Sequence, residues 1–228
     1  MERPRALISV WDKLGVVEFA SSLDSMGWGI VSTGGTASTL REAGIDVTDV
    51  SEVTGHPEIF DGRVKTLHPA VQAGILARRD SQEDMSKLTE LGYHAIDLVC
   101  VNLYPFKATA SRDPPASVAE LIEMIDIGGP TMVRSAAKNH LGVIVATDPT
   151  QYEPILAALS DADGLPAGVD HEMRKSLALD AFRATAAYEN SVSSELEDRF
   201  SELDVPGVIN VSSGTGIALR YGENPHQP

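Results

Sequence analysis

The sequence is poor in cysteine, in basic residues and in long apolar runs. Its one cysteine, Cys100, cannot form an intrachain disulfide, which is typical of proteins from a reducing compartment. No run approaches the roughly 20 apolar residues of a membrane-spanning helix, and the charged first 20 residues do not resemble a signal peptide. The 18 basic residues are outnumbered by 33 acidic ones, a net charge of −15 that argues against nucleic-acid or anionic-membrane binding. We therefore expect a cytoplasmic protein with no nucleic-acid and no membrane partner.

The usual residues of metal and covalent catalysis are also scarce. The six histidines show no ligand-type spacing, a single cysteine cannot build a thiolate cluster, and no Gly-x-Ser-x-Gly motif is present. We expect no metal. What remains is Lys, Asp, Tyr, Asn and backbone N–H groups, a set that suits proton transfer and oxyanion stabilisation on a phosphorylated substrate.

The apolar pattern predicts an α/β fold. With 43% hydrophobic and 22% charged residues the chain is globular. Strand-like and helical segments alternate along its first two-thirds, which predicts a parallel sheet flanked by helices. The expected strands are 6–10, 29–32, 45–50, 96–103 and 142–146, and the expected helices are 16–26, 33–43, 118–125 and 130–138.

The pattern also suggests how the chain is divided. We expect a core over 1–147, a helical extension over 148–206 that carries much of the acidic excess, and a linker with the start of another domain over 207–228. Residues 51–75 have polar and Gly/Pro punctuation, which predicts a long loop of the kind that is usually functional.

Three predicted strands end in polar residues. Ligands of open parallel sheets bind beyond the carboxyl ends of the strands, which points to residues 9–13, 32–36 and 102–104. Free N–H groups where a helix starts favour an anion, so the Thr-Gly-Gly-Thr run at 33–36 fits a phosphate site about as well as a plain tight turn. Asp12 and Lys13, alone a charged turn, strengthen the phosphate interpretation.

Further candidates lie in two later segments. Arg63 and Lys65 alternate within the polar loop, and they fit either a solvated cation pair or a ligand site. Asp126 precedes Gly-Gly-Pro, where it could serve only as a helix cap. Lys138 shares a helix face with Arg134 in an apolar segment, which favours a functional role.

Six ordered motifs carry a family resemblance: SVWDK (9–13), STGGT (32–36), DGRVKTLHP (61–69), NLYPF (102–106), IDIGG (125–129) and AAKNH (136–140). In this order they resemble the IMP cyclohydrolase domain of the bifunctional purine-biosynthesis proteins. The resemblance extends over essentially the whole chain.

This resemblance implies a methylglyoxal-synthase-like fold, a homodimer, and no metal or cofactor. The implied reaction is the dehydrative ring closure of 5-formamidoimidazole-4-carboxamide ribonucleotide to IMP. By motif, Lys65, Tyr104, Asp126 and Lys138 match the family's catalytic positions. The matched substrate contacts are Trp11, Asp12, Lys13, Thr33, Gly34, Gly35 and Thr36 on the phosphate side, and Arg63, Val64, Thr66, Asn102, Ile127 and Gly128 around ribose and base.

Two features depart from the simplest form of this interpretation. Trp11 stands where the family often has a hydroxyl-bearing residue, so a phosphate contact is put in doubt there. Residues 219–227 resemble the opening of the partner formyltransferase domain, so we expect that domain in the full-length protein and no formyl transfer by this chain. The alternatives are a methylglyoxal-synthase-type lyase and a non-catalytic nucleotide-sensing module.

Overall fold

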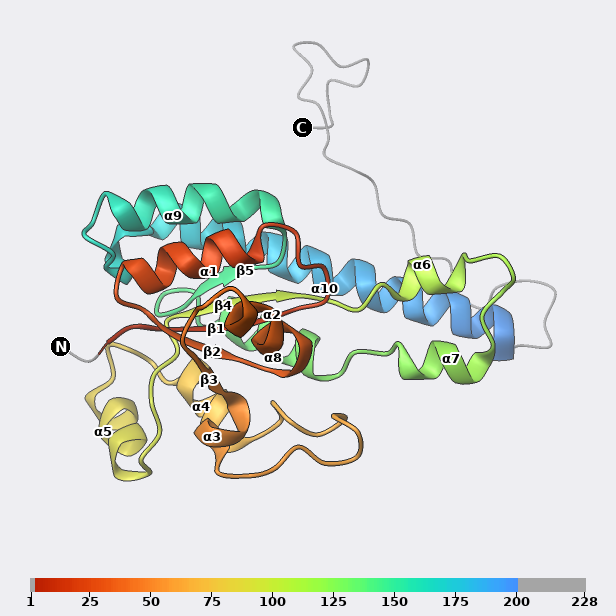
Figure 1. The fold of residues 1–228 in the computed structure, drawn as a ribbon, viewed down its shortest axis with the longest axis horizontal. Coiled ribbons are helices and arrows are strands. Elements are labelled where there is room, and N and C mark those ends of the chain that lie inside the picture. The colour runs from red at the N-terminus through yellow and green to blue at the C-terminus, as the bar shows by residue number, and fades with distance from the viewer. Residues whose placement is uncertain (1–2, 201–228) are drawn as a thin grey trace, which may run out of the picture.

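A five-stranded parallel sheet forms the centre of the computed structural model, which describes residues 3–200 (Figure 1). In chain order the strands are β1 (Arg5–Val10), β2 (Gly29–Ser32), β3 (Val47–Asp49), β4 (Leu98–Asn102) and β5 (Ile144–Ala146). Their order across the sheet is β3-β2-β1-β4-β5, with every neighbouring pair parallel. The predicted parallel sheet is confirmed.

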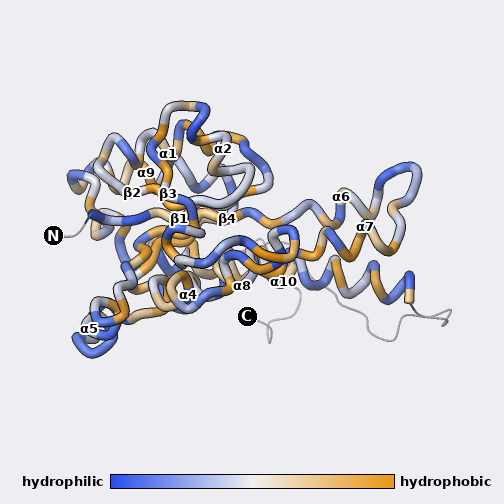
Figure 2. The backbone as a smooth tube through the Cα atoms, turned by 60° about the horizontal axis from the view of Figure 1, so that its bottom comes forward, coloured by the Kyte–Doolittle hydropathy of each residue, from blue (hydrophilic) through white to orange (hydrophobic). Residues whose placement is uncertain are grey.

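The neighbouring strands β1 and β4 carry consecutive apolar residues because helices cover both faces of the sheet. Residues 6–8 of β1 and 98–101 of β4 are all fully or almost fully buried. Figure 2 shows this contrast, with hydrophilic residues predominating in α5 (Gln82–Glu90) at the periphery.

The helices between the parallel strands lie on the two faces of the sheet, because connections between parallel strands are right-handed. The remaining helices are α1 (Val16–Ser25), α2 (Gly34–Glu42), α3 (Val50–Thr54), α4 (Pro69–Leu76), α6 (Phe106–Ala110), α7 (Val118–Glu123), α8 (Gly128–Lys138), α9 (Tyr152–Ser160) and α10 (His171–Phe200), with short 3₁₀ turns at Pro149–Gln151 and Pro166–Gly168. The rule puts α1 and α2 on one face and α4 and α8 on the other. Helix α9 packs against α1, and α10 packs against α8 and β5.

Helix α10 extends well beyond the sheet, where α6 and α7 lie beside it (Figure 1). A second, smaller apolar cluster joins these three helices, with Phe106, Leu121, Tyr188 and Val192 among its buried members. The predicted division at 147/148 stays a prediction, and the predicted segment 207–228 lies outside the described residues.

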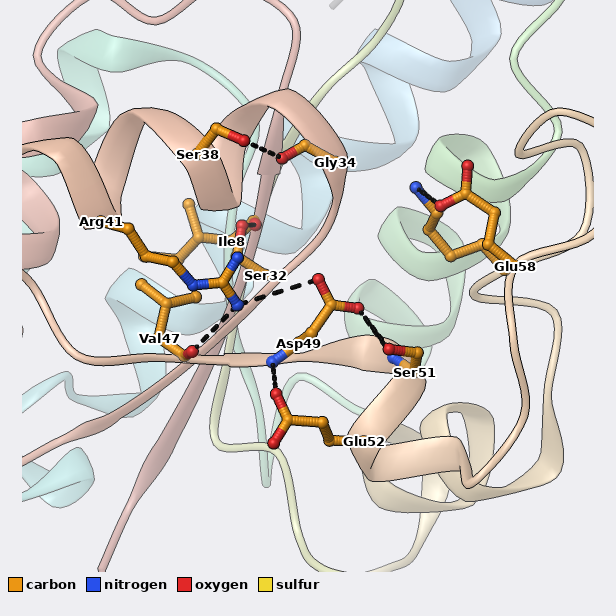
Figure 3. Close-up of polar contacts among 11 residues, drawn as sticks. Ile8, Ser32, Gly34, Ser38, Arg41, Val47, Asp49, Ser51, Glu52 and Glu58 are labelled. Carbon is orange, nitrogen blue, oxygen red and sulfur yellow. Dashed lines mark hydrogen bonds and ion pairs between the residues drawn. The ribbon is translucent and has the colours of Figure 1, made fainter.

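The predicted loop over 51–75 was wrong at both ends, because each end is a helix. Asp49 forms a capping box with Glu52, which starts α3 at Val50 (Figure 3). His68 accepts a hydrogen bond from the N–H of Ala70 and Pro69 occupies the first turn, so α4 begins there. The irregular segment is therefore 55–68, and the third strand is shorter than the predicted 45–50.

Besides α3 and α4, the helices α5 and α6 were not predicted. The segment 82–90 is too polar to show an apolar stripe, although Ser81 caps it by accepting a hydrogen bond from the N–H of Asp84. Helix α6 has only five residues, too few for a periodic pattern. No helix within residues 3–200 is long and apolar enough to cross a membrane.

Candidate active site

The order of strands reverses between β1 and β4, which is where open α/β sheets bind ligands. Val10 and Asn102 are register partners at the carboxyl ends of these two strands. The side-chain oxygen of Asn102 accepts hydrogen bonds from the N–H groups of Trp11 (2.5 Å) and Asp12 (3.0 Å), and its amide nitrogen donates to the carbonyl of Asp12 (2.9 Å). The predicted ligand residue Asn102 thus holds the loop after β1 in place.

The start of α2 lies beside this loop. Gly34 has a φ of +47°, a conformation that favours glycine, and a Cβ on it would lie 3.3 Å from the Nζ of Lys65. A Cβ on Gly35 would meet nothing within 4 Å, and both glycines are exposed, so the first turn of α2 is accessible. The Thr33 side chain makes no cap hydrogen bond, because its hydroxyl pairs with that of Ser9 at 3.0 Å.

Lys13 reaches the same corner from the loop after β1. Its ammonium donates to the Val10 carbonyl and to the hydroxyl of Thr36 at 3.1 Å. Burial lowers the pKa of Lys13, an effect that the charge of Asp12 partly opposes. The predicted phosphate-side residues Lys13, Thr33 and Thr36 are therefore brought together at the start of α2.

A hairpin in the irregular segment brings in Lys65. Ile59 and Val64 form a β-bridge, and Asp61 and Gly62 turn the chain with positive φ values of 53° and 90°. The Lys65 side chain is 18% exposed and is paired with Glu58. Figure 3 shows Glu58 across from Gly34 at the start of α2.

Asp126 and Tyr104 meet at the start of α8. The Asp126 carboxylate accepts a hydrogen bond from the N–H of Gly129 at 2.7 Å and another from the backbone of Tyr104. A Cβ on Gly129 would clash with the Asp126 carboxylate and would lie 2.9 Å from Leu103, so any other residue here would displace that carboxylate. A Cβ on Gly128 would lie 2.6 Å from the Thr66 hydroxyl, which places Thr66 against the same turn.

The electrostatics of this turn suit proton transfer. Burial raises the pKa of Asp126, and the hydrogen bonds from Gly129 and Tyr104 oppose that rise in part. Burial also raises the pKa of Tyr104, and the nearby charges of Asp126 and Glu58 add to the rise. A carboxylate with a raised pKa is the better proton acceptor near neutral pH. Trp11 packs its ring against that of Tyr104, with centroids 5.1 Å apart, and is 51% exposed.

Three predicted residues take other positions. Arg63 is paired with Glu123 of α7 at the surface. Ile127 is exposed at the start of α8, beside the turn. Lys138 is exposed at the last position of α8, ten residues beyond Gly128, so about 15 Å of helix separates it from the turn. Within one chain, Lys138 does not join Lys65, Tyr104 and Asp126.

Two residues of this region were missed from the sequence. Glu58 lies in a loop with no motif of its own, and only its ion pair with Lys65 reveals it. Tyr188 contacts the Asp126 backbone from α10, 62 residues along the chain. No local pattern could have indicated it, since its spacing fits an ordinary buried helix face.

Within residues 3–200 no group of three or more His, Cys, Asp or Glu side chains is arranged to hold a metal ion. The chemical tools of this region are one half-buried carboxylate, one phenol and backbone N–H groups at the turn, and the Lys65 ammonium near the start of α2.

Known proteins share this architecture. The family model described as MGS-like domain matches residues 15–131, more than half of the chain. The chain belongs to the MGS-like domain family. The predicted methylglyoxal-synthase-like fold is thereby confirmed. A solved structure titled "Crystal structure of ForH" superposes with a TM-score of 0.76 at 39% identity, over 86% of this chain and 100% of that one.

Outside the span of the MGS-like model, a second model, AICARFT/IMPCHase bienzyme, matches residues 136–228. The bifunctional purine biosynthesis protein PurH of Deinococcus deserti is 54% identical over 98% of this chain, and that of a Bacillus cereus strain is 49% identical over 99%. These matches confirm the resemblance to the bifunctional purine-biosynthesis proteins. The chain spans 42% and 43% of the length of these two relatives.

Proposed function

We propose that this MGS-like chain is an IMP cyclohydrolase, which closes the ring of 5-formamidoimidazole-4-carboxamide ribonucleotide and releases water. The observation that carries the proposal is that Asp126 meets Tyr104 at the start of α8, while Lys65, paired with Glu58, lies against Gly34 at the start of α2. Asn102, at the end of β4 where the strand order reverses, lies two residues before Tyr104. The named relatives and the AICARFT/IMPCHase match support the same reaction.

The phosphate of the substrate binds at the start of α2. Helix N-termini attract anions through free N–H groups and the helix dipole, and Gly34 and Gly35 in the first turn are exposed. Lys13 and Thr36 add a cation and a hydroxyl at the same place.

Ring closure joins the carboxamide nitrogen to the formyl carbon of the same molecule, so orientation supplies much of the rate. Asp126 accepts the proton that leaves the nitrogen. Lys65, Tyr104 and the N–H groups near Gly128 stabilise the negative charge that develops on the formyl oxygen, which takes the proton back from Asp126 and becomes a hydroxyl. The C–O bond then breaks as the C=N bond of the new ring forms, and the hydroxyl leaves as water with the proton of the formamide nitrogen.

The partners follow from the same family. We propose that the chain acts as a homodimer in the cytoplasm, beside the formyltransferase domain of a longer protein, and needs no metal, cofactor, nucleic acid or membrane. Lys138 stays in this proposal as the fourth catalytic residue.

The test is to add the formamido ribonucleotide and follow IMP formation by ultraviolet absorbance. We expect turnover. Methylglyoxal formation from a triose phosphate would instead support the lyase alternative. IMP binding without turnover would support the nucleotide-sensing alternative.

The phosphate site makes a prediction for Gly35→Ala. Alanine favours a helix over glycine by about 1 kcal/mol, so thermal stability is expected to rise slightly. The new Cβ enters the space proposed for the phosphate, so the Kd for IMP is expected to rise about 10-fold, or about 1.4 kcal/mol. Calorimetric titration and thermal melts measure both. Ser38→Ala, later in the same helix, is the control and should keep the parental Kd. An unchanged Kd in Gly35→Ala would remove the phosphate from this position.

A further inference from the structure

Tyr188 of α10 forms hydrogen bonds to the backbone at and just before Asp126. Its hydroxyl accepts a hydrogen bond from the N–H of Asp126 at 2.8 Å and donates one to the carbonyl of Met124 at 2.9 Å. A single oxygen therefore joins two residues of the short connection between α7 and α8. Tyr188 is 9% exposed, so water does not readily replace these hydrogen bonds.

The ring of Tyr188 extends the same support to Tyr104. It packs edge-on against Phe106, with centroids 6.4 Å apart, and the Phe106 N–H donates to the carbonyl of Tyr104 at 2.8 Å. Tyr104 and Tyr188 also line one cavity of about 540 Å³. Asp126 and Tyr104, the two residues proposed to act on the substrate, are thus both supported by the Tyr188 side chain of α10.

Asp126 needs this support because its carboxylate position follows from its backbone. The carboxylate reaches the N–H of Gly129 only while residues 124–126 keep their path. Removing the Tyr188 hydroxyl would leave a partly buried donor and a partly buried acceptor without this partner, a loss that favours local rearrangement of residues 124–126.

We propose that Tyr188 is a positioning residue that holds Asp126, and through Phe106 also Tyr104, in the geometry for proton transfer. The proposal rests on the proposed cyclohydrolase function. It assigns to α10 a part in the reaction, although no residue of this helix belongs to the motifs that carry the resemblance.

The test is Tyr188→Phe, which keeps the ring in its apolar cluster and removes only the hydroxyl. We expect kcat for IMP formation to fall about 10- to 10²-fold, since displacements of about 1 Å at a reaction centre have effects of this size. The Kd for IMP should change less than about twofold, because the phosphate site is not touched. Tyr152→Phe is the control, since it removes a buried hydroxyl that contacts Cys100 in the core.

A double mutant separates positioning from general destabilisation. On an Asp126→Asn background, Tyr188→Phe is expected to have no further effect on kcat, because the group that it positions is already gone. A parental kcat in Tyr188→Phe, or the same fractional loss on both backgrounds, would overturn the proposal.

Amide hydrogen exchange makes the test independent of the proposed reaction. In Tyr188→Phe the exchange of the Asp126 N–H should accelerate, while that of the β1 and β4 amides stays parental. If the parental chain forms no IMP, the proposed function fails but this measurement still tests the support of Asp126. Unchanged exchange at Asp126 would overturn it.

Discussion

Replacing Asp126 by asparagine is expected to lower kcat for IMP formation about 10²- to 10⁴-fold, the usual contribution of a general acid or base. Asparagine has the same shape and can still accept the hydrogen bond from the N–H of Gly129. The fold and the Kd for IMP should therefore stay close to parental, and steady-state kinetics with an IMP titration measure the difference. Asp170→Asn is the matched control, because Asp170 accepts a hydrogen bond from the N–H of Met173, also three residues on, at the start of α10.

The pH dependence of kcat gives a second signature of Asp126. Burial raises the pKa of its carboxyl above the ordinary aspartate value of 3.8. Below its pKa the carboxyl is protonated and cannot accept a proton, so activity should fall as the pH drops through this raised value. The acidic limb should disappear from the residual activity of Asp126→Asn. An unchanged acidic limb in that variant would assign it to another group.

Lys138→Ala is expected to lower kcat by a similar factor, about 10²- to 10⁴-fold, with a smaller effect on the Kd for IMP. The reason is the match of Lys138 to a catalytic position of the family, and the removal of an exposed side chain should not unfold the chain. Lys87→Ala is the control, since Lys87 also lies in the last turn of a helix and pairs only locally with Glu90. A parental kcat in Lys138→Ala would remove Lys138 from the mechanism.

A mixing experiment shows which chain supplies Lys138, given the length of α8 between it and Asp126. Lys138→Ala chains are combined with Asp126→Asn chains and allowed to exchange. If each site combines the two residues from different copies, random mixing restores about a quarter of the parental activity. If no activity returns, Asp126 and Lys138 act within one chain. The two ends of α8 would then have to lie closer to one substrate than they do in this structure.

The turn at Asp126 illustrates which features of the candidate site a motif indicates and which features of its geometry the motif leaves open. The Asp-Ile-Gly-Gly run marked a helix start and a carboxylate, since both follow from local backbone chemistry. It could not show that Gly129 must be glycine to leave room for that carboxylate and for Leu103. That contact depends on how closely α8 approaches the end of β4, which is set by packing.

Arg63 and Lys65 also show a difference between what sequence spacing indicates and what the backbone geometry decides. Their alternation placed both in one loop, but the hairpin turns Lys65 toward Gly34 and Arg63 toward Glu123 of α7. Side chains two residues apart on an extended chain commonly point to the same face. Here the chain turns at residues 60–62, which have positive φ values, just before Arg63 and Lys65. Sequence spacing alone could not foresee those backbone angles.

The sequence by itself determined the parallel sheet, most of its helices and the family, because apolar runs, capping residues and ordered motifs are properties of neighbouring residues. Only the tertiary structure decided that Asn102 holds the loop after β1, that Glu58 pairs with Lys65, that Tyr188 supports Asp126, and that Lys138 stands a helix length away. The contacts of Asn102 and Tyr188 join residues 91 and 62 positions apart, whose distance is fixed by how helices pack on a sheet and not by any local preference. The pairing of Glu58 with Lys65 depends on the hairpin between them, and the distance of Lys138 from Asp126 on the unbroken helix α8.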